Sequence, residues 1–410
     1  MNNTPELLSP AGDLDKMRFG IAYGADAVYM AGTRFGMRAA ATNFDDNALR
    51  EGIAYAHAHG VKCYITVNIM PSNRDLPALP AYLELLQDAG ADALIIADVG
   101  VLRMARRYAP KVPVHISTQT SILNHEAANY WADEGAERIV LARELSLEEI
   151  AEIRAKTPKE LEIEAFVHGA MCISYSGRCL ISQYMTGRDA NHGACAQPCR
   201  WNYSLMEEKR PGQFFPVEED GRGTYLYNSK DMCMIEHVPE LIEAGITSFK
   251  IEGRNKTAYY AACVTGAYRA AIDTYKKDPE NFVLPQFCRD EVNKVSHREY
   301  YTGFYFGNQE NGQHYGDSQY IREYEVVGMP VECDDSGKAV FALKNRFFDG
   351  EELELIQPGQ APYVFRAENV TDDEGTKREL FNVPQMRVHF VFPFKVSEWA
   401  ILRKAKERPE

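Results

Sequence analysis

The sequence lacks the segments that carry a chain into or across a membrane. Its first residues, MNNTPELLSP, hold neither the basic region nor the apolar core of a secretory signal. No apolar run reaches the length of a membrane span. We therefore expect a cytoplasmic protein, in which thiols stay reduced. Its 410 residues suffice for one large domain and a small one, and the composition is that of an ordinary globular protein.

Motifs of several common enzyme classes are also missing. No G-x-G-x-x-G follows a predicted strand and no Walker P-loop is present, so a nucleotide cofactor lacks support. The histidines do not have the H-E-x-x-H spacing of a metalloprotease, and there is no G-x-S-x-G elbow. A peptidase would therefore need a cysteine nucleophile, drawn from thiols that metal ligation explains better.

Basic residues are in the minority: 45 Lys and Arg residues stand against 59 Asp and Glu residues, which gives a formal net charge of −14. An acidic molecule repels nucleic acid at long range, so an RNA-binding function needs a local basic surface. Two segments have an excess of basic residues: residues 168–202, with three arginines against one aspartate, and the stretch from Arg403 to Arg408. Solvated side chains on a loop and a helix explain these charges equally well.

The stretch from His168 to Trp201 holds four of the nine cysteines. Cys172, Cys179, Cys195 and Cys199 have the spacing C-x6-C-x15-C-x3-C. Reduced thiols so close together are more readily metal ligands than disulfides. Zinc sites usually use C-x2-C pairs, whereas all-thiolate ligation of an iron–sulfur cluster tolerates irregular spacing. The residues alone leave open an iron–sulfur cluster, a structural zinc ion and unligated thiols.

Residues 164–182 match the pattern E-x-F-x2-G-(S/A)-(L/I/V/M)-C-x4-G-x-C-x-(L/I/V/M)-S. Four further blocks are PELLSPAGDLDKMRFGIAYGADAVY from Pro5, LARELSLEEI from Leu141, YNSKDM from Tyr227 and FKIEGRNK from Phe249. By these motifs, nearly the whole chain resembles the collagenase-like peptidase family, the thirty-second family of peptidases with unassigned mechanism. The blocks are most similar to its branch of prephenate-dependent tRNA hydroxylases, which form 5-hydroxyuridine at the wobble uridine.

The resemblance implies a function and its cofactors. It implies an iron–sulfur cluster on the four cysteines, prephenate as co-substrate and the tRNA anticodon loop as partner. A sibling branch acts on a cytidine of ribosomal RNA, so the target base stays open. The alternatives are the peptidase of the family's name, an rRNA cytidine hydroxylase and a non-catalytic RNA-binding protein.

A repeated unit predicts the fold of the first two thirds of the chain. In this unit a helix-like stretch is followed by a glycine and a short β-rich run that ends in polar residues. Five units lie at Tyr23–Gly32, His59–Asn68, Ala89–Asp98, Glu134–Arg143 and Ala244–Gly253. Three more runs, ELLSPAG, VPVHIST and LEIEAFVHG, fit without the glycine. Eight such strands alternating with helices predict an α/β fold, a (β/α)8 TIM-like barrel, with a doubly wound open sheet as the alternative.

The rest of the chain predicts a second, smaller domain. We expect the barrel over residues 1–277, with the cysteine-bearing insertion at 168–235, after the seventh strand. A linker and extension follow at 278–318. Short runs of alternating apolar and polar residues between Gly/Asp turns predict a small antiparallel β-barrel at 319–397, and residues 398–410 read as a basic tail.

Polar residues at the strand ends are the candidate site, because the C-terminal ends of barrel strands form the active face. They are Ser9, Gly12, Arg34, Asn68, Asp98, Ser117, Gln119, Arg143, His168, Glu252 and Arg254. The catalytic candidates are His168 and Glu252, which suit acid/base chemistry, and Arg143, which can grip a carboxylate through two hydrogen bonds. Asp98 and Ser117 suit helix caps equally well.

The remaining candidates bind substrate. The cations expected to hold the carboxylates of prephenate are Arg34, Arg254 and Arg143. Asn68 and Gln119 lie at the same strand ends. Because the cysteine stretch follows the seventh strand, the cluster and the pocket are expected to share one face of the barrel.

Three aromatic residues of the cysteine stretch are candidates to contact RNA. Tyr175, Tyr184 and Trp201 could stack on a uridine that leaves its loop, which a single-stranded anticodon loop permits at low cost. Packing within the insertion is the simpler explanation.

Overall fold

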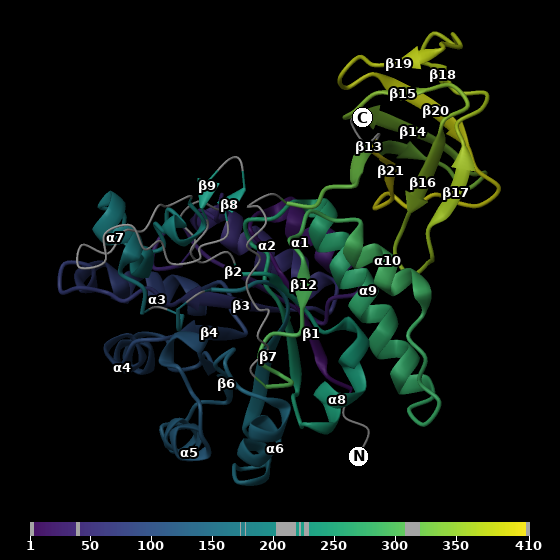
Figure 1. Cartoon of the computed structure of the whole chain (residues 1–410). Helices are drawn as coiled ribbons and strands as arrows, with labels where there is room; N and C mark the ends of the chain where they lie inside the picture. Colours follow the sequence, from purple (N-terminus) through teal and green to yellow (C-terminus); the bar gives the residue numbers. More distant parts are fainter. Residues whose placement is uncertain are drawn as a thin grey trace.

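A computed structural model of the chain describes residues 4–37, 42–172, 174–176, 178–201, 219–220, 223–224, 229–307 and 320–406. Arg408 of the basic C-terminal stretch and the side chain of Arg200 lie outside this description. Figure 1 shows a large α/β body and a smaller β lobe beyond helices α9 and α10. Within the described ranges, no helix is long and apolar enough to cross a membrane.

The large body is a closed barrel of eight parallel strands. They are β1 (Glu6–Pro10), β2 (Ala27–Met30), β3 (Lys62–Val67), β4 (Ala93–Ile96), β5 (Val114–Ile116), β6 (Arg138–Val140), β7 (Glu162–Ala170) and β11 (Ser248–Ile251). Each strand pairs with the next, and β11 pairs with both β7 and β1, which closes the barrel. Every residue of β2, β4 and β11 is buried, as expected for strands covered on both faces. The predicted (β/α)8 barrel is confirmed.

Helices cover the outside of the barrel (Figure 1). They are α1 (Leu14–Ala22), α2 (Asp46–Ala58), α3 (Leu79–Asp88), α4 (Val99–Tyr108), α5 (His125–Asp133), α6 (Leu147–Ala155), α8 (Val238–Glu243) and α9 (Ala258–Lys277), with short 3-10 turns η1 (Leu76–Ala78), η2 (Thr118–Thr120) and η5 (Ile235–His237). Ser146 and Glu149 form the predicted capping box of α6. Asp98 caps α4 by accepting a hydrogen bond from Val101 N, so its role is structural.

The insertion after β7 begins with the cysteine stretch and returns to the barrel at β10. Its described elements are α7 (Ile181–Thr186), η3 (Ala190–His192), η4 (Pro198–Arg200), β8 (Glu219–Asp220), β9 (Gly223–Thr224) and β10 (Asp231–Cys233). β10 pairs antiparallel with the end of β7, and β12 (Tyr300–Tyr301) extends the sheet outside the barrel. Helix α10 (Gln286–Asn293) packs against α9.

The small lobe is a curled antiparallel sheet that forms a half-barrel. Its strands are β13 (Tyr324–Cys333), β14 (Lys338–Leu343), β16 (Glu352–Ile356), β17 (Tyr363–Arg366), β18 (Thr371–Asp372), β20 (Arg387–Val391) and β21 (Ile401–Ala405), and a separate pair joins β15 (Phe347–Phe348) to β19 (Leu380–Phe381). The predicted basic tail is corrected here, since β21 lies between β16 and β13 inside the sheet. Its apolar residues Ile401 and Leu402 are fully buried, which explains why this segment forms a strand.

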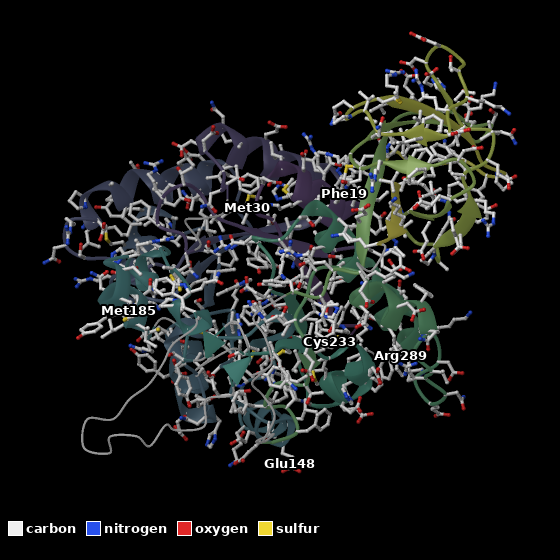
Figure 2. All side chains as sticks on the ribbon, turned by 45° about the horizontal axis from the view of Figure 1, so that its top comes forward. Phe19, Met30, Glu148, Met185, Cys233 and Arg289 are labelled. Carbon is white, nitrogen blue, oxygen red and sulfur yellow. The ribbon has the colours of Figure 1, made fainter. Side chains whose placement is uncertain are left out.

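The two bodies share apolar and charged contacts. Ile356 and Ile401 of the lobe belong to the main core of the barrel. Trp399 packs edge-on against Phe19 of α1, with ring centroids 5.4 Å apart, and Figure 2 shows Phe19 at the junction with the lobe. Arg403 of β21 is fully buried and pairs with Glu291 of α10.

Candidate functional site

A cavity of about 70 Å³ lies at the strand ends of the barrel, and we call it the barrel-mouth pocket. Residues from seven of the eight barrel strands or the loops that follow them line it: Tyr29, Met37, Thr66, Asn68, Ile95, Ser117, Thr118, Gln119, Val140, Arg143, Phe166, Ser176, Lys250, Glu252 and Arg254. Six of the predicted strand-end residues meet here: Asn68, Ser117, Gln119, Arg143, Glu252 and Arg254. The structure thus brings residues far apart in the sequence to one place.

A second cavity of about 220 Å³ adjoins the first, and we call it the cysteine pocket. All four predicted ligands, Cys172, Cys179, Cys195 and Cys199, line it. The two pockets share four lining residues: Met37, Arg143, Ser176 and Glu252. The cysteine stretch therefore lies against the active face of the barrel, as expected from its place after β7.

The four thiols suit a metal group by their chemistry. None of the four is in a disulfide, and Cys195 Sγ accepts a hydrogen bond from the backbone N–H of Gln197. Among the residues that the structure describes, no three His, Cys, Asp or Glu side chains converge closely enough to hold a metal ion. The donor set fits an all-thiolate cluster or zinc, and the cysteines share one cavity without converging on one point.

Arg143 and Glu252 stand between the two pockets. Arg143 Nη2 is 3.3 Å from Glu252 Oε2, and its Nη1 donates to the carbonyl oxygen of Ala170 at 2.8 Å. The guanidinium lies 3.8 Å from the centre of the Phe166 ring. Arg143 Nε has no hydrogen-bond partner in the described part of the structure although it is buried. A buried guanidinium with a free N–H group is a ready anchor for an anionic ligand.

Hydrogen bonds connect the side chains of Asn68, Ser117 and Gln119, which form a polar wall of the barrel-mouth pocket. Asn68 Nδ2 donates to Gln119 Oε1 at 2.8 Å, and Gln119 Nε2 donates to the Asn68 carbonyl oxygen at 2.5 Å. Ser117 Oγ donates to the same Gln119 oxygen at 2.6 Å. These amides therefore satisfy one another and form a rigid polar wall.

Arg254 lines the pocket, and the first βα loop lies directly against its backbone. A Cβ atom at Gly12 would stand 2.0 Å from the Arg254 carbonyl oxygen, so only glycine fits there. The guanidinium donates to Thr66 Oγ1 at 3.3 Å and to the Met37 carbonyl oxygen. Arg254 thus adds a second buried cation to the pocket.

Lys250 lines the barrel-mouth pocket and Glu164 pairs with it, and the sequence interpretation named neither as a candidate. Lys250 Nζ donates to Glu164 Oε1 at 2.6 Å, and Arg138 Nη1 lies 3.0 Å from the other Glu164 oxygen. Burial lowers the pKa of Lys250, and the Glu164 carboxylate opposes that shift. Strand alternation was the available signal, since Ser248 and Lys250 face the barrel interior while Phe249 and Ile251 face the helices.

His168 lies outside the pocket to which the sequence assigned it. Phe166 pairs with Lys250 while His168 pairs with Ile251, so β7 carries one extra residue at Val167. This bulge turns His168 away from the barrel interior, against Tyr268 of α9 and Tyr300 of β12. Burial lowers the pKa of His168 to about 3, so the ring is neutral near neutral pH. The described geometry gives it no acid/base role in the pocket.

Two other strand-end candidates also lie elsewhere. Arg34 is largely exposed, pairs with both carboxylate oxygens of Asp46 and stacks on the Tyr82 ring. Ser9 is buried and shares a hydrogen bond of 2.9 Å with Thr265 on α9. Both side chains point toward the surrounding helices and not into the barrel, since Ser9 contacts α9 and Arg34 contacts α2.

The aromatic candidates lie on the outer surface of the insertion. Tyr184 of α7 is 89% exposed, Tyr175 is 43% exposed and Trp201 is 41% exposed. Leu180 and Met185 are exposed beside them in sequence, and Figure 2 shows Met185 on the side of the molecule away from the small lobe. Exposed large apolar side chains gathered on one element are typical of a binding surface rather than of packing.

Comparison with known proteins identifies related sequences. A family model described as "Peptidase family U32" matches residues 12–315, and one described as "Peptidase family U32 C-terminal domain" matches residues 322–403. The matches cover both the barrel with its insertion and the small lobe.

Curated relatives are similar over most of the chain. "tRNA hydroxylation protein P1" of Bacillus subtilis is 39% identical over 98% of this chain and 95% of its own length. "tRNA hydroxylation protein P" of Escherichia coli is 37% identical over 90% of each chain. The Escherichia coli protein named "23S rRNA 5-hydroxycytidine C2501 synthase" is 40% identical over 80% of this chain and 48% of its own length.

Proposed function

The chain belongs to peptidase family U32, and from that membership and the geometry of its site we propose that it is an RNA-modifying enzyme that hydroxylates tRNA. The observation that carries the proposal is the similarity, over nearly the full length of both chains, to a protein named for tRNA hydroxylation. More finely, we propose that it forms 5-hydroxyuridine at the wobble position with prephenate as co-substrate. The resemblance of the sequence motifs supports this finer part.

The pockets support a small anionic co-substrate. Arg143 and Arg254 supply two buried cations, and a dicarboxylate such as prephenate requires such partners. Glu252, paired with Arg143, is the candidate acid/base group now that His168 faces away from the pocket.

The cysteine pocket is the proposed place of an iron–sulfur cluster. Cys172, Cys179, Cys195 and Cys199 would hold it, since all four line the same cavity. When bound, such a cluster would supply a redox or Lewis-acid centre beside the barrel-mouth pocket. Arg143 and Glu252 line both cavities, so they would orient a substrate between the two.

Recognition of tRNA is assigned to the insertion. An acidic protein must attract RNA through local features, and the exposed Tyr175, Tyr184 and Trp201 offer flat surfaces on which unstacked bases can lie. Because the cysteine pocket also belongs to the insertion, a base held by these rings would be close to the site of chemistry.

Nucleoside analysis tests the proposal. The protein is expressed in a bacterial strain that lacks its own tRNA hydroxylation protein. Its tRNA and rRNA are then digested to nucleosides, which are separated by chromatography and identified by mass spectrometry. We expect 5-hydroxyuridine in tRNA with the wild-type protein and none with Cys179→Ala. Cys333→Ala, which changes an exposed thiol of the small lobe, is the matched control and should retain activity.

The other outcomes separate the alternatives. 5-Hydroxycytidine in rRNA without a tRNA product would make the chain an rRNA hydroxylase, the second candidate that the 23S rRNA relative favours. Unchanged tRNA hydroxylation by Cys179→Ala would contradict the role of the cysteines. Iron, acid-labile sulfide and zinc, measured together on anaerobically purified protein, distinguish a cluster from a zinc site.

A further inference from the structure

Lys250 brings an amine into a pocket whose other cations are guanidinium groups. Its side chain lines the barrel-mouth pocket with Arg143 and Arg254. A guanidinium serves to bind a carboxylate, but it stays protonated and does not act as a nucleophile. An amine can do both, because it forms imines with carbonyl compounds once it is deprotonated. The pocket therefore combines two kinds of group that recognise different parts of one ligand.

The surroundings of Lys250 provide a route for its proton. Glu164 Oε1 accepts from Nζ at 2.6 Å, so a carboxylate is already placed to take a proton from the amine. The other charges that face it are Arg138, which lies on the far side of Glu164, and Glu252. The Nζ atom also lies 4.5 Å from the centre of the Tyr29 ring and 5.3 Å from that of Phe166. Burial lowers the pKa of Lys250, which favours the free amine.

The size of the pocket indicates which part of a ligand it takes. Its volume of about 70 Å³ holds roughly five to seven atoms of the size of a water molecule, at about 10–15 Å³ each. A keto group joined to a carboxylate has this size. Arg143 Nε, buried and without a partner in the described part of the chain, is available to the carboxylate. The remainder of a larger ligand can extend into the adjoining cysteine pocket.

We propose that Lys250 forms an imine with the keto carbon of a 2-oxo carboxylate held in the barrel-mouth pocket. The C–N bond forms when the free amine attacks the keto carbon, after its proton has passed to Glu164. One hydrogen then passes from the nitrogen to the former keto oxygen, and Glu164 returns its proton to the same oxygen, which leaves as water. An ammonium group and a ketone thus become an iminium ion and water, and Glu164 is again a carboxylate. No oxidant or reductant is consumed. The iminium holds the ligand covalently and withdraws electrons from the neighbouring carbon–carbon bond.

The identity of the ligand in the cell rests on the proposed function. Prephenate carries a 2-oxo carboxylate on its side chain, so it belongs to the class that Lys250 and Arg143 would recognise. Pyruvate is the smallest member of the same class and serves as a probe that does not depend on tRNA.

Reductive trapping tests the imine. The full-length protein is incubated with pyruvate or with prephenate, sodium borohydride is added, and peptides are mapped by mass spectrometry. We expect a stable adduct on the peptide that contains Lys250 only when a keto acid is present. The adduct should be absent in Lys250→Arg, which keeps the positive charge, and present in Lys404→Arg, which changes a buried lysine of the small lobe.

The outcomes distinguish this inference from the proposed function. Protein that hydroxylates tRNA but gives no adduct at Lys250 with either acid overturns the imine and leaves the function standing. Protein that is trapped at Lys250 but forms no 5-hydroxyuridine supports the imine and contradicts the function. Equal labelling of other lysines also overturns the inference. Mapping of the wild-type protein decides these cases even if Lys250→Arg does not fold.

Discussion

At the scale of residues, the site is a set of buried charges held in pairs. Arg143 pairs with Glu252 between the two pockets, and Lys250 pairs with Glu164 deeper in the barrel. Buried charges persist only where they are paired and hydrogen-bonded, and Arg138 serves Glu164 in that way. Because each charge depends on its partner, even a conservative substitution at one of these residues should have a measurable effect on activity or stability.

Arg143→Lys should weaken binding of an anionic co-substrate while leaving the fold intact. Lysine keeps the charge but cannot reach the Ala170 carbonyl, Glu252 and a ligand at the same time. Loss of one charged hydrogen bond of about 1.5–3 kcal/mol predicts a fall in kcat/KM of about 10- to 150-fold. Kinetics of the proposed hydroxylation, at varied concentrations of the proposed co-substrate prephenate, measure this fall.

The control for Arg143 is Arg106→Lys, which changes an exposed arginine that pairs with Glu134 on the outside of the barrel. It should leave kcat/KM unchanged. A similar loss in both variants would mean that Arg143 acts through stability and not through the ligand.

His168 should make the protein less stable in acid. Its pKa is about 3 in the folded state, against about 6.5 when the chain is unfolded, so between these values the unfolded state binds the additional proton. Stability is therefore full above pH 6.5 and falls as pH drops below it, by about 1.4 kcal/mol per pH unit for this group. His168→Phe removes that dependence.

Urea unfolding of wild type and His168→Phe from pH 7.5 to 5.5 tests this effect. Over this range the free energy of unfolding of the wild type should fall by about 1.4 kcal/mol more than that of His168→Phe. Parallel profiles would show that His168 is not a buried neutral ring.

At the scale of elements, the insertion after β7 contributes both to a pocket and to an exposed surface. Its first part lines the cysteine pocket, and helix α7 presents exposed aromatic and apolar side chains outward. At the end of β7, the bulge turns the side chain of His168 outward toward the helices. The side chains of Phe166 and Glu164, before the bulge, stay inside the barrel. One inserted residue thus decides which side chains reach the pocket.

Tyr184→Ala should reduce tRNA affinity without changing the chemical step. Stacking of a base on an aromatic ring contributes about 1–3 kcal/mol, so the Kd should rise by about 5- to 150-fold. Filter binding at fixed salt concentration measures it. Tyr130→Ala on α5 removes an equally bulky ring that is 54% exposed elsewhere on the barrel, and its Kd should equal that of the wild type. Equal losses in both variants would exclude a specific platform on α7.

At the scale of the whole molecule, a buried ion network joins the two bodies. Arg403 of β21 contacts Glu354 in its own lobe and Glu291 of α10, and Lys294 also pairs with Glu354. Tyr23 of the barrel donates a hydrogen bond to the Trp399 carbonyl at 3.1 Å. These contacts hold the lobe against α10 and the end of α1, and Figure 1 shows the lobe lying beyond α9 and α10.

Arg403→Ala should therefore destabilise the protein. It leaves two buried carboxylates without their shared partner, which costs about 3–5 kcal/mol and lowers the midpoint of thermal unfolding. Arg387→Ala removes an arginine of the same lobe that is 40% exposed and pairs with Glu332, and such surface pairs contribute at most about 1 kcal/mol. Equal midpoints for both variants would show that the network is not what joins the lobe to the barrel.

Much of this architecture could be predicted from the sequence by itself. Each of the eight predicted strand runs holds one barrel strand, because parallel strands buried on both faces must be apolar and must alternate with helices. The four cysteines were recognisable as one group, and their place after the seventh strand put them at the active face, where they line one cavity. Asn68, Gln119, Arg143, Glu252 and Arg254 were found by the same rule, since strand C-termini meet at one end of a barrel.

Only the tertiary structure decided the rest. The bulge that removes His168 from the pocket is a matter of register between β7 and β11, which no local pattern displays. Lys250 and Glu164 are adjacent because closure of the barrel pairs β7 with β11, and their opposite charges make that burial tolerable. Residues 401–405 are basic in part and read as a tail, yet Glu354 and Glu291 accept the charge of Arg403 and allow the segment to become an internal strand. A charged side chain can be buried only beside a partner of opposite charge, and in this protein those partners are distant in sequence. Only the folded structure shows which residues are brought together.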